Sequence, residues 1–182
     1  AEIVREKGTD RSAFFRGEVD RYGWVALGSS FLPSELIAAF LLAQLEAVDE
    51  IQAKRLAAWR GYWDRLVDLQ TCGDVQLPSI PNFASNNAHM FYLICDSLAT
   101  RSRLIDYLKG EGIMAVFHYQ ALHSSRYFAG QHGDRPMPNA TRYAETLVRL
   151  PLFADLPEQE VDRIASAVRR FFGSPAYSGR GV

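Results

Sequence analysis

The sequence predicts an α+β fold, and three patterns carry that prediction. Apolar residues recur at three- and four-residue steps from Pro33 to Leu69, which is the period of a helix. Two segments with the composition of strands, 88–95 and 113–119, flank a short helical segment at 100–109. An amphipathic segment follows Pro157 and predicts a closing helix. The chain is therefore expected to be a long helix followed by a small unit of mixed strands and helices.

The composition is that of an ordinary globular protein. Hydrophobic residues make up 48% and charged residues 23% of the 182 residues, and the formal net charge is −1. This balance gives no global field that would recruit nucleic acid or an anionic membrane. No apolar run approaches the ~20 residues that a membrane-spanning helix needs. Because Cys72 and Cys95 are the only cysteines, no disulfide framework is expected, and a reducing cytoplasm is the simpler location.

Residues 1–32 are expected to be largely loop, because glycines punctuate them closely. Arginines and aromatic residues are interleaved there, so the segment is expected to lie against another surface. A nucleic-acid site would show the same interleaving, but Asp10, Glu18 and Asp20 dilute the charge and disfavour it. The first seven residues begin without Met and resemble the end of an amphipathic helix. They favour the interpretation that the chain is a fragment of a longer protein, although a chain that had been shortened deliberately would begin in the same way.

One long helix is expected at 33–72. Pro33 suits the first helical position, Glu35 complements the positive end of the helix, and Gly73 ends it. If unbroken, the helix is ~54 Å long at ~1.5 Å per residue. A domain of this size cannot cover that length, so the helix is expected to link two domains or to lie along a subunit interface. A kink near Lys54 would weaken this inference.

The rest of the chain alternates strand and helix signals. A short strand is expected at 74–77, before the strand–helix–strand unit that ends at Tyr119. Asn139 can cap a helix that runs to Thr146. The apolar segment 148–153 predicts a short strand or an extended turn, after which the closing helix begins.

The predicted strand at 113–119 brings His118 and Tyr119 to its exit, and His123 follows after a short apolar step. Sheets present polar groups to ligands in this way, so we expect His118 and Tyr119 to be partly exposed. Strand ends also carry structural histidines, so a satisfied core position for His118 is an open alternative. A metal site with His132 or His89 as a further ligand is disfavoured, because the spacing matches no helical ligand pair.

Four segments match a known family pattern in order. Residues 112–123 begin with Gly-Ile and approach the signature His-Tyr-x-Pro-Leu-His, with Ala121 in place of the proline. Residues 27–31, 89–92 and 150–152 are similar to a glycine-x-Asn-Tyr-Arg segment, a His-x-Phe strand and a closing Leu-Pro-Leu. The chain thereby resembles the sugar-nucleotide aminotransferases of the DegT/DnrJ/EryC1/StrS family, which use pyridoxal phosphate.

The resemblance implies a more specific fold. It would be the C-terminal small domain of a fold-type I aminotransferase, with a long N-terminal helix and a small, mostly antiparallel sheet with flanking helices. Residues 1–32 would then belong to the large-domain side and the interface, and residues 33–72 would form the long linking helix. Residues 73–173 would form the small α+β domain, and 174–182 a disordered tail.

Segments 6–9, 14–17 and 28–30 narrow the resemblance. They are similar to the branch that aminates dTDP-4-keto-6-deoxy-D-glucose to dTDP-4-amino-4,6-dideoxy-D-galactose, with glutamate as amino donor. The resemblance implies a cytoplasmic homodimer in cell-surface polysaccharide biosynthesis, acting on a nucleotide sugar without nucleic-acid, membrane or metal partners.

The resemblance also implies site residues. Ser30, with Ser29 beside it, would reach the phosphate of the pyridoxal phosphate in the neighbouring subunit, since a hydroxyl can donate to a phosphate oxygen. The substrate region would be faced by His118, Tyr119 and His123, whose individual roles the resemblance leaves open.

Family members hold the cofactor through a lysine, and this chain offers only Lys7, Lys54 and Lys109. None stands in the family's Ser-Phe-His-x-x-Lys-Asn setting. The chain is therefore interpreted as the C-terminal part of such an enzyme, without a catalytic residue and inactive alone, and not expected to bind the cofactor alone. Two alternatives are a stand-alone module that binds a small polar ligand at 112–123 and a dimerisation module built on the long helix.

Overall fold

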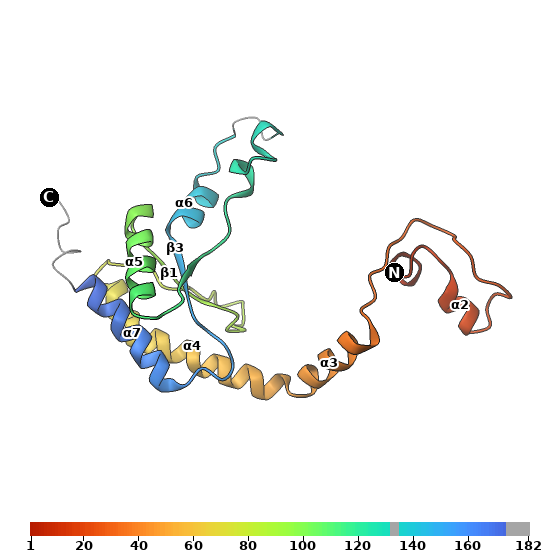
Figure 1. Ribbon diagram of the computed structural model, residues 1–182, viewed down its shortest axis with the longest axis horizontal. Helices are drawn as coiled ribbons and strands as arrows, with labels where there is room; N and C mark the ends of the chain where they lie inside the picture. The colour runs from red at the N-terminus through yellow and green to blue at the C-terminus, as the bar shows by residue number, and fades with distance from the viewer. Residues whose placement is uncertain (132–134, 174–182) are drawn as a thin grey trace. The chain divides into compact units, whose positions relative to one another are not determined.

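The computed structural model describes residues 1–131 and 135–173 of a chain that divides into two compact units (Figure 1). The N-terminal unit comprises Ala1–Val48, and the C-terminal unit comprises Asp49–Val182. The predicted disordered tail at 174–182 lies outside the described residues.

The N-terminal unit consists of loops and helices. Its helices are α1 (Glu2–Arg5), α2 (Arg11–Phe15) and α3 (Glu35–Glu46). The segment around Gly8 pairs with the loop that follows α2 through isolated antiparallel bridges. These bridges join Glu6 to Ser30 and Thr9 to Trp24.

Close backbone approach explains two glycines of this unit. Gly8 has φ +78°, and a Cβ there would lie 1.8 Å from the carbonyl oxygen of Ala26. A Cβ on Gly28 would lie 2.2 Å from the backbone nitrogen of Gly8. Only glycine lets two backbones approach this closely. The two loops therefore pack backbone against backbone at Gly8 and Gly28. This close contact, a glycine interlock, fixes the path of both loops.

The long helix predicted from Pro33 is interrupted at Ala47. α3 ends at Glu46, and Ala47 leaves helical geometry with φ −100° and ψ 9°. α4 (Val48–Thr71) starts with two acidic residues in its first turn, which favour a new helix start there. No residue of α3 is buried. One continuous helix was therefore the wrong prediction, and the long helix of the fold is α4, with 24 residues.

Within its described residues, the C-terminal unit forms a three-stranded antiparallel sheet in the order β1-β3-β2. The strands are β1 (Phe91–Ile94), β2 (Val116–Phe117) and β3 (Leu147–Leu150). Arg149, in the middle strand, stands opposite Tyr92 on one side and Val116 on the other. The predicted α+β class, with a small antiparallel sheet beside a long helix, is confirmed.

Several element boundaries differ from the prediction. The strands are shorter, because pairing with β3 involves only four residues of β1 and two of β2. The segment at 74–77 contributes an isolated bridge between Gln76 and Ile94. Asn139 does not cap its helix but lies inside α6 (Pro138–Thr146). Pro138, whose ring restricts φ to near the helical value, starts α6, so the helix begins two residues before position 140, where a cap at Asn139 would place its start.

The core of the C-terminal unit lies between helices and sheet. The helices that supply it are α4, α5 (Leu98–Gly110) and α7 (Glu158–Phe172). Its large side chains with almost no exposure are Tyr62, Leu66, Phe91, Leu93, Leu104, Leu108, Val148, Val161 and Val168. The Tyr62 hydroxyl donates to the Pro151 carbonyl oxygen at 2.9 Å, which satisfies the one polar atom of that side chain.

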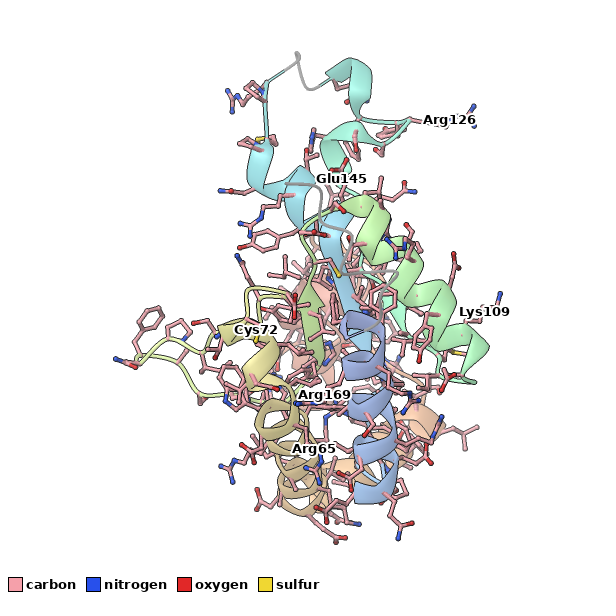
Figure 2. The ribbon with its side chains drawn as sticks, turned by 90° about the vertical axis from the view of Figure 1, so that its left-hand side faces the viewer. Arg65, Cys72, Lys109, Arg126, Glu145 and Arg169 are labelled. Carbon is pink, nitrogen blue, oxygen red and sulfur yellow. The ribbon has the colours of Figure 1, made fainter. Side chains whose placement is uncertain are left out.

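Ion pairs join α4 and α7 at the surface. Arg65 on α4 contacts Asp162 and, at 3.1 Å, Glu158, and Arg169 on α7 lies 2.6 Å from Asp68. Figure 2 shows Arg65 and Arg169 where these two helices lie side by side. None of the helices in the described residues is both long and apolar enough to span a bilayer.

Candidate functional site

Ser29 and Ser30 lie on the interlocked loops of the N-terminal unit. The backbone N–H of Ser29 donates to the Val4 carbonyl at 3.0 Å, and its own carbonyl accepts from Lys7 N–H at 3.1 Å. Ser30 takes part in the bridge with Glu6. Both serines are exposed although their backbone is tied down. The loop therefore presents two hydroxyl groups from a fixed backbone, which suits an oxyanion such as a phosphate.

His118 and Tyr119 follow β2 directly, as predicted. His118 is half-buried, whereas Tyr119 is 79% exposed, and their ring centroids are 4.8 Å apart. The expectation of two partly exposed side chains at a strand exit is thereby confirmed.

The His118 ring is not a satisfied core histidine. Its Nδ1 is buried, and no hydrogen-bond partner for it exists among the described residues. Burial lowers the pKa of His118, and the charges of Arg149 and His89 lower it further. The surroundings of the imidazole therefore favour its neutral form.

His123 occupies a different place. It lies in the 3₁₀ turn η1 (Leu122–Ser124), which is followed by η2 (Ala129–Gln131). Its Nε2 is 3.4 Å from the Thr141 hydroxyl on α6. It also lines a cavity of about 410 Å³ whose other lining residues are Leu122, Phe128, Gln131, Met137 and Ala140. The structure therefore brings His118 and Tyr119 together but gives His123 separate surroundings.

Arg149 is a candidate that the sequence reasoning missed. Its Nε is buried, and the part of the chain that the structure describes offers it no hydrogen-bond partner. Together with His89 it lines a groove of about 220 Å³, whose walls include Met90, Met114 and Val116. The available signal was a single arginine within the apolar run from Leu147 to Leu152. An arginine there has to be accommodated on the less buried face of a strand.

The described residues contain no group of three or more His, Cys, Asp or Glu side chains that could hold a metal ion. Among the histidines considered as metal ligands, His132 lies outside the described residues. Cys95 is buried, and burial raises the pKa of its thiol to about 12, which keeps it protonated and unreactive.

Solved structures with a similar fold are aminotransferases. The aminotransferase from Psychrobacter cryohalolentis matches with a TM-score of 0.82 and 17% identity, over 94% of this chain and 48% of that chain. PseC from Helicobacter pylori, involved in pseudoaminic acid biosynthesis, matches with a TM-score of 0.78 and 19% identity, over 94% and 45%. A DegT DnrJ EryC1 StrS aminotransferase from Brucella abortus matches with a TM-score of 0.73 and 24% identity, over 90% and 43%.

These likenesses establish the fold, and the chain spans less than half the length of each matched structure. The sequence itself gives the family. The profile of the DegT/DnrJ/EryC1/StrS aminotransferase family matches residues 1–169, and the chain belongs to that family.

Proposed function

We propose that this member of the aminotransferase family supplies the C-terminal part of an enzyme that aminates a nucleotide sugar. The substrate is dTDP-4-keto-6-deoxy-D-glucose, the product is dTDP-4-amino-4,6-dideoxy-D-galactose, and glutamate is the amino donor. The family match over residues 1–169 is the observation that carries the proposal. The choice of sugar and donor rests on the segments 6–9, 14–17 and 28–30.

The N-terminal unit fits one part of pyridoxal phosphate, its phosphate group. Ser29 and Ser30 are exposed on a loop whose backbone is fixed by the glycine interlock, so their hydroxyls can donate without reordering the chain. When bound, the cofactor supplies the electron sink that transamination needs. The proposed role of the two serines is to hold its phosphate in the neighbouring subunit of a homodimer.

The lysines of the chain do not offer a covalent anchor for the cofactor. Lys54 contacts Glu50 at 2.7 Å and Asp155 at 3.3 Å, and these partners raise its pKa, which keeps it charged and non-nucleophilic. Lys109 lies in the last turn of α5. Lys7 has a left-handed backbone with φ +65° in the loop after α1. We therefore propose that the anchoring lysine is not among these three and that the chain alone is inactive.

The C-terminal unit is proposed to contact the nucleotide-sugar substrate. His118 places a half-buried imidazole and Tyr119 an exposed phenol at the exit of β2. His123 adds an imidazole at a second cavity. Side chains of this kind position polar groups of a sugar by hydrogen bonds. The cellular setting proposed for this reaction is the cytoplasm.

The test compares this chain with a protein in which it is joined to the family's lysine-bearing part. Both are supplied with pyridoxal phosphate, glutamate and dTDP-4-keto-6-deoxy-D-glucose. The joined protein should release the 4-amino sugar with the galacto configuration, which NMR of the product identifies, and the chain alone should release none. Turnover by the chain alone, or clear preference for another keto sugar, would contradict the proposal.

A further inference from the structure

Two residues other than glycine have a positive φ within the described part of the chain, Lys7 at +65° and Ala88 at +47°. The left-handed conformation brings a Cβ too close to the following carbonyl oxygen, so each of the two needs a compensation. At Ala88 the compensation is visible in the core. Its methyl group has no exposed surface, and its carbonyl oxygen accepts from Arg55 Nε at 3.1 Å. Packing therefore accounts for Ala88.

Lys7 has no compensation of this kind. It is the first central residue of a turn that the N–H of Thr9 closes by donating to the Glu6 carbonyl at 3.2 Å. Gly8, the second central residue, has φ +78°. A turn with two positive φ values prefers glycine, asparagine or aspartate at both positions. The Lys7 side chain is exposed, and the structure records no ion pair or hydrogen bond for its ammonium group among the described residues. Packing and pairing within the chain therefore do not explain a lysine at this position.

The backbone places Lys7 beside the two serines proposed to hold a phosphate. The N–H of Lys7 donates to the carbonyl oxygen of Ser29 at 3.1 Å, so the turn lies directly against the serine loop. The acidic residue of the turn, Glu6, is engaged elsewhere. Its carboxylate accepts from the Ser12 hydroxyl at 3.0 Å and lies 3.9 Å from Arg11. The positive charge of Lys7 is therefore left for a ligand at the serine loop.

We propose that Lys7 binds the phosphate of the cofactor together with Ser29 and Ser30, as the charged member of the site. This inference rests on the proposed function, which assigns that phosphate to the two serines. Serine hydroxyls donate hydrogen bonds but bring no charge, whereas a phosphate monoester carries about two negative charges near pH 7. An ammonium group on a flexible stem supplies a point charge that suits a tetrahedral phosphate. Lys7 is thus a non-covalent ligand and not the covalent anchor of the cofactor.

The experiment uses the joined protein described above and compares two ligands by equilibrium dialysis. Pyridoxal phosphate carries the group that Lys7 would bind, and pyridoxal lacks it. Lys7→Met should weaken binding of pyridoxal phosphate by about tenfold or more, the size expected when a charge-assisted hydrogen bond is lost, and leave pyridoxal binding unchanged. Lys7→Arg keeps the charge and should retain most of the affinity. The matched control is Lys109→Met, in the last turn of α5 (Figure 2).

Lys7→Gly separates a role in binding from a role in folding. Glycine adopts a positive φ without strain, so this variant suits the turn better than wild type does. The amide of Val25, which donates to the Gly8 carbonyl at 2.8 Å, should therefore exchange no faster than in wild type. Affinity for pyridoxal phosphate should nevertheless fall as in Lys7→Met. Unchanged affinity in both variants, or faster exchange at Val25 with equal losses for the two ligands, would overturn the proposal.

Two further measurements keep the outcomes separate. The substrate also carries phosphate, so dTDP is titrated as well, and a loss of dTDP binding without a loss of pyridoxal phosphate binding would overturn the assignment of Lys7. Turnover of a different keto sugar would count against the proposed function and leave the role of Lys7 intact. Normal turnover with unchanged cofactor affinity in Lys7→Met would count against Lys7 alone. A joined wild-type protein that binds no pyridoxal phosphate would contradict both.

Discussion

The C-terminal unit has a core of buried large apolar side chains, whereas the N-terminal unit buries none of its large apolar side chains. Leu66, Phe91 and Leu93 in the C-terminal unit have essentially no exposed surface. In the N-terminal unit, Trp24 is 83% and Leu27 95% exposed, and the whole of α3 has no buried residue. The C-terminal unit is thus stabilised by a core. The N-terminal unit is stabilised by backbone hydrogen bonds and by the close backbone contacts of Gly8.

This difference bears on assembly. Exposed apolar patches beyond a few hundred Å² are rare on monomeric proteins and usually mark interaction surfaces. α3 alone exposes Leu36, Ile37, Phe40, Leu41, Leu42 and Leu45. A unit of this kind is expected to gain its order from another surface, which agrees with the proposed place of residues 1–32 at an interface.

The largest expected effect comes from removing a core aromatic. Phe91 has no exposed surface and contacts the rings of Trp59 and Tyr62 at centroid distances of 5.4 and 5.2 Å. Phe91→Ala should lower the free energy of unfolding by ~3–5 kcal/mol. Phe40→Ala, in the N-terminal unit, should change it little, because that side chain is 71% exposed. Urea denaturation measures both, and similar losses would erase the contrast between the units.

The next effect concerns the glycine interlock. Gly8→Ala should disrupt the N-terminal loops, because the new Cβ would meet the Ala26 carbonyl at 1.8 Å. Gly17→Ala is the control, since its φ of +74° is similar but nothing lies within 4 Å of its Cβ. The control should cost only the ~1–2 kcal/mol of a left-handed alanine. Hydrogen exchange at the amide of Val25, which donates to the Gly8 carbonyl at 2.8 Å, reports the difference. Equal exchange in both variants would show that close approach does not matter.

A smaller effect is expected at Tyr62. Tyr62→Phe removes the hydroxyl that donates to the Pro151 carbonyl and should cost ~0.5–1.5 kcal/mol of unfolding free energy. Tyr127→Phe, at a side chain that is 74% exposed, should cost almost nothing. Thermal and urea unfolding of the two variants give the comparison. An unchanged free energy of unfolding in Tyr62→Phe would mean that water takes the place of the hydroxyl as the donor to the Pro151 carbonyl.

The smallest effect is a pH dependence. The pKa of His118 is lowered in the folded chain from its ordinary 6.5, so the unfolded chain binds the proton more readily. Its contribution to stability is present above pH 6.5 and is lost as pH falls below that value. His118→Gln should flatten this part of the stability profile, while Gln120→Ala should not. If the free energy of unfolding of wild type, relative to that of His118→Gln, increased as the pH fell, the pKa of His118 would be raised rather than lowered on folding.

Sequence patterns located the elements of the C-terminal unit better than their ends. Pro157 and the acidic residues after it marked α7, and the run that ends at Tyr119 placed His118 at a strand exit. The ends of strands depend on pairing with a distant partner, which no local pattern records. The break at Ala47 was missed for a related reason. Helical periodicity continues across it, so no local pattern marks the end of α3.

The candidate site was predictable where residues share a segment. His118 and Tyr119 are neighbours in sequence, so a strand exit brought them into view together. Arg149 is brought near them only by the register of β2 with β3, so no local sequence pattern indicated it as a candidate. Ser29 and Ser30 came from the family resemblance, because two loop serines carry no pattern of their own.

Hydrogen exchange of the whole chain tests the contrast between the units most directly. Amides of the β1–β3 pairing, such as Leu93 and Val148, should exchange with the free energy of global unfolding. Amides of Lys7, Ser29 and Phe31, although hydrogen-bonded at 3.0–3.1 Å, should exchange far faster, because no core closes over them. Protection of both sets at the same free energy would contradict the account, because it would show that the N-terminal unit is as stable as the C-terminal unit without a partner surface.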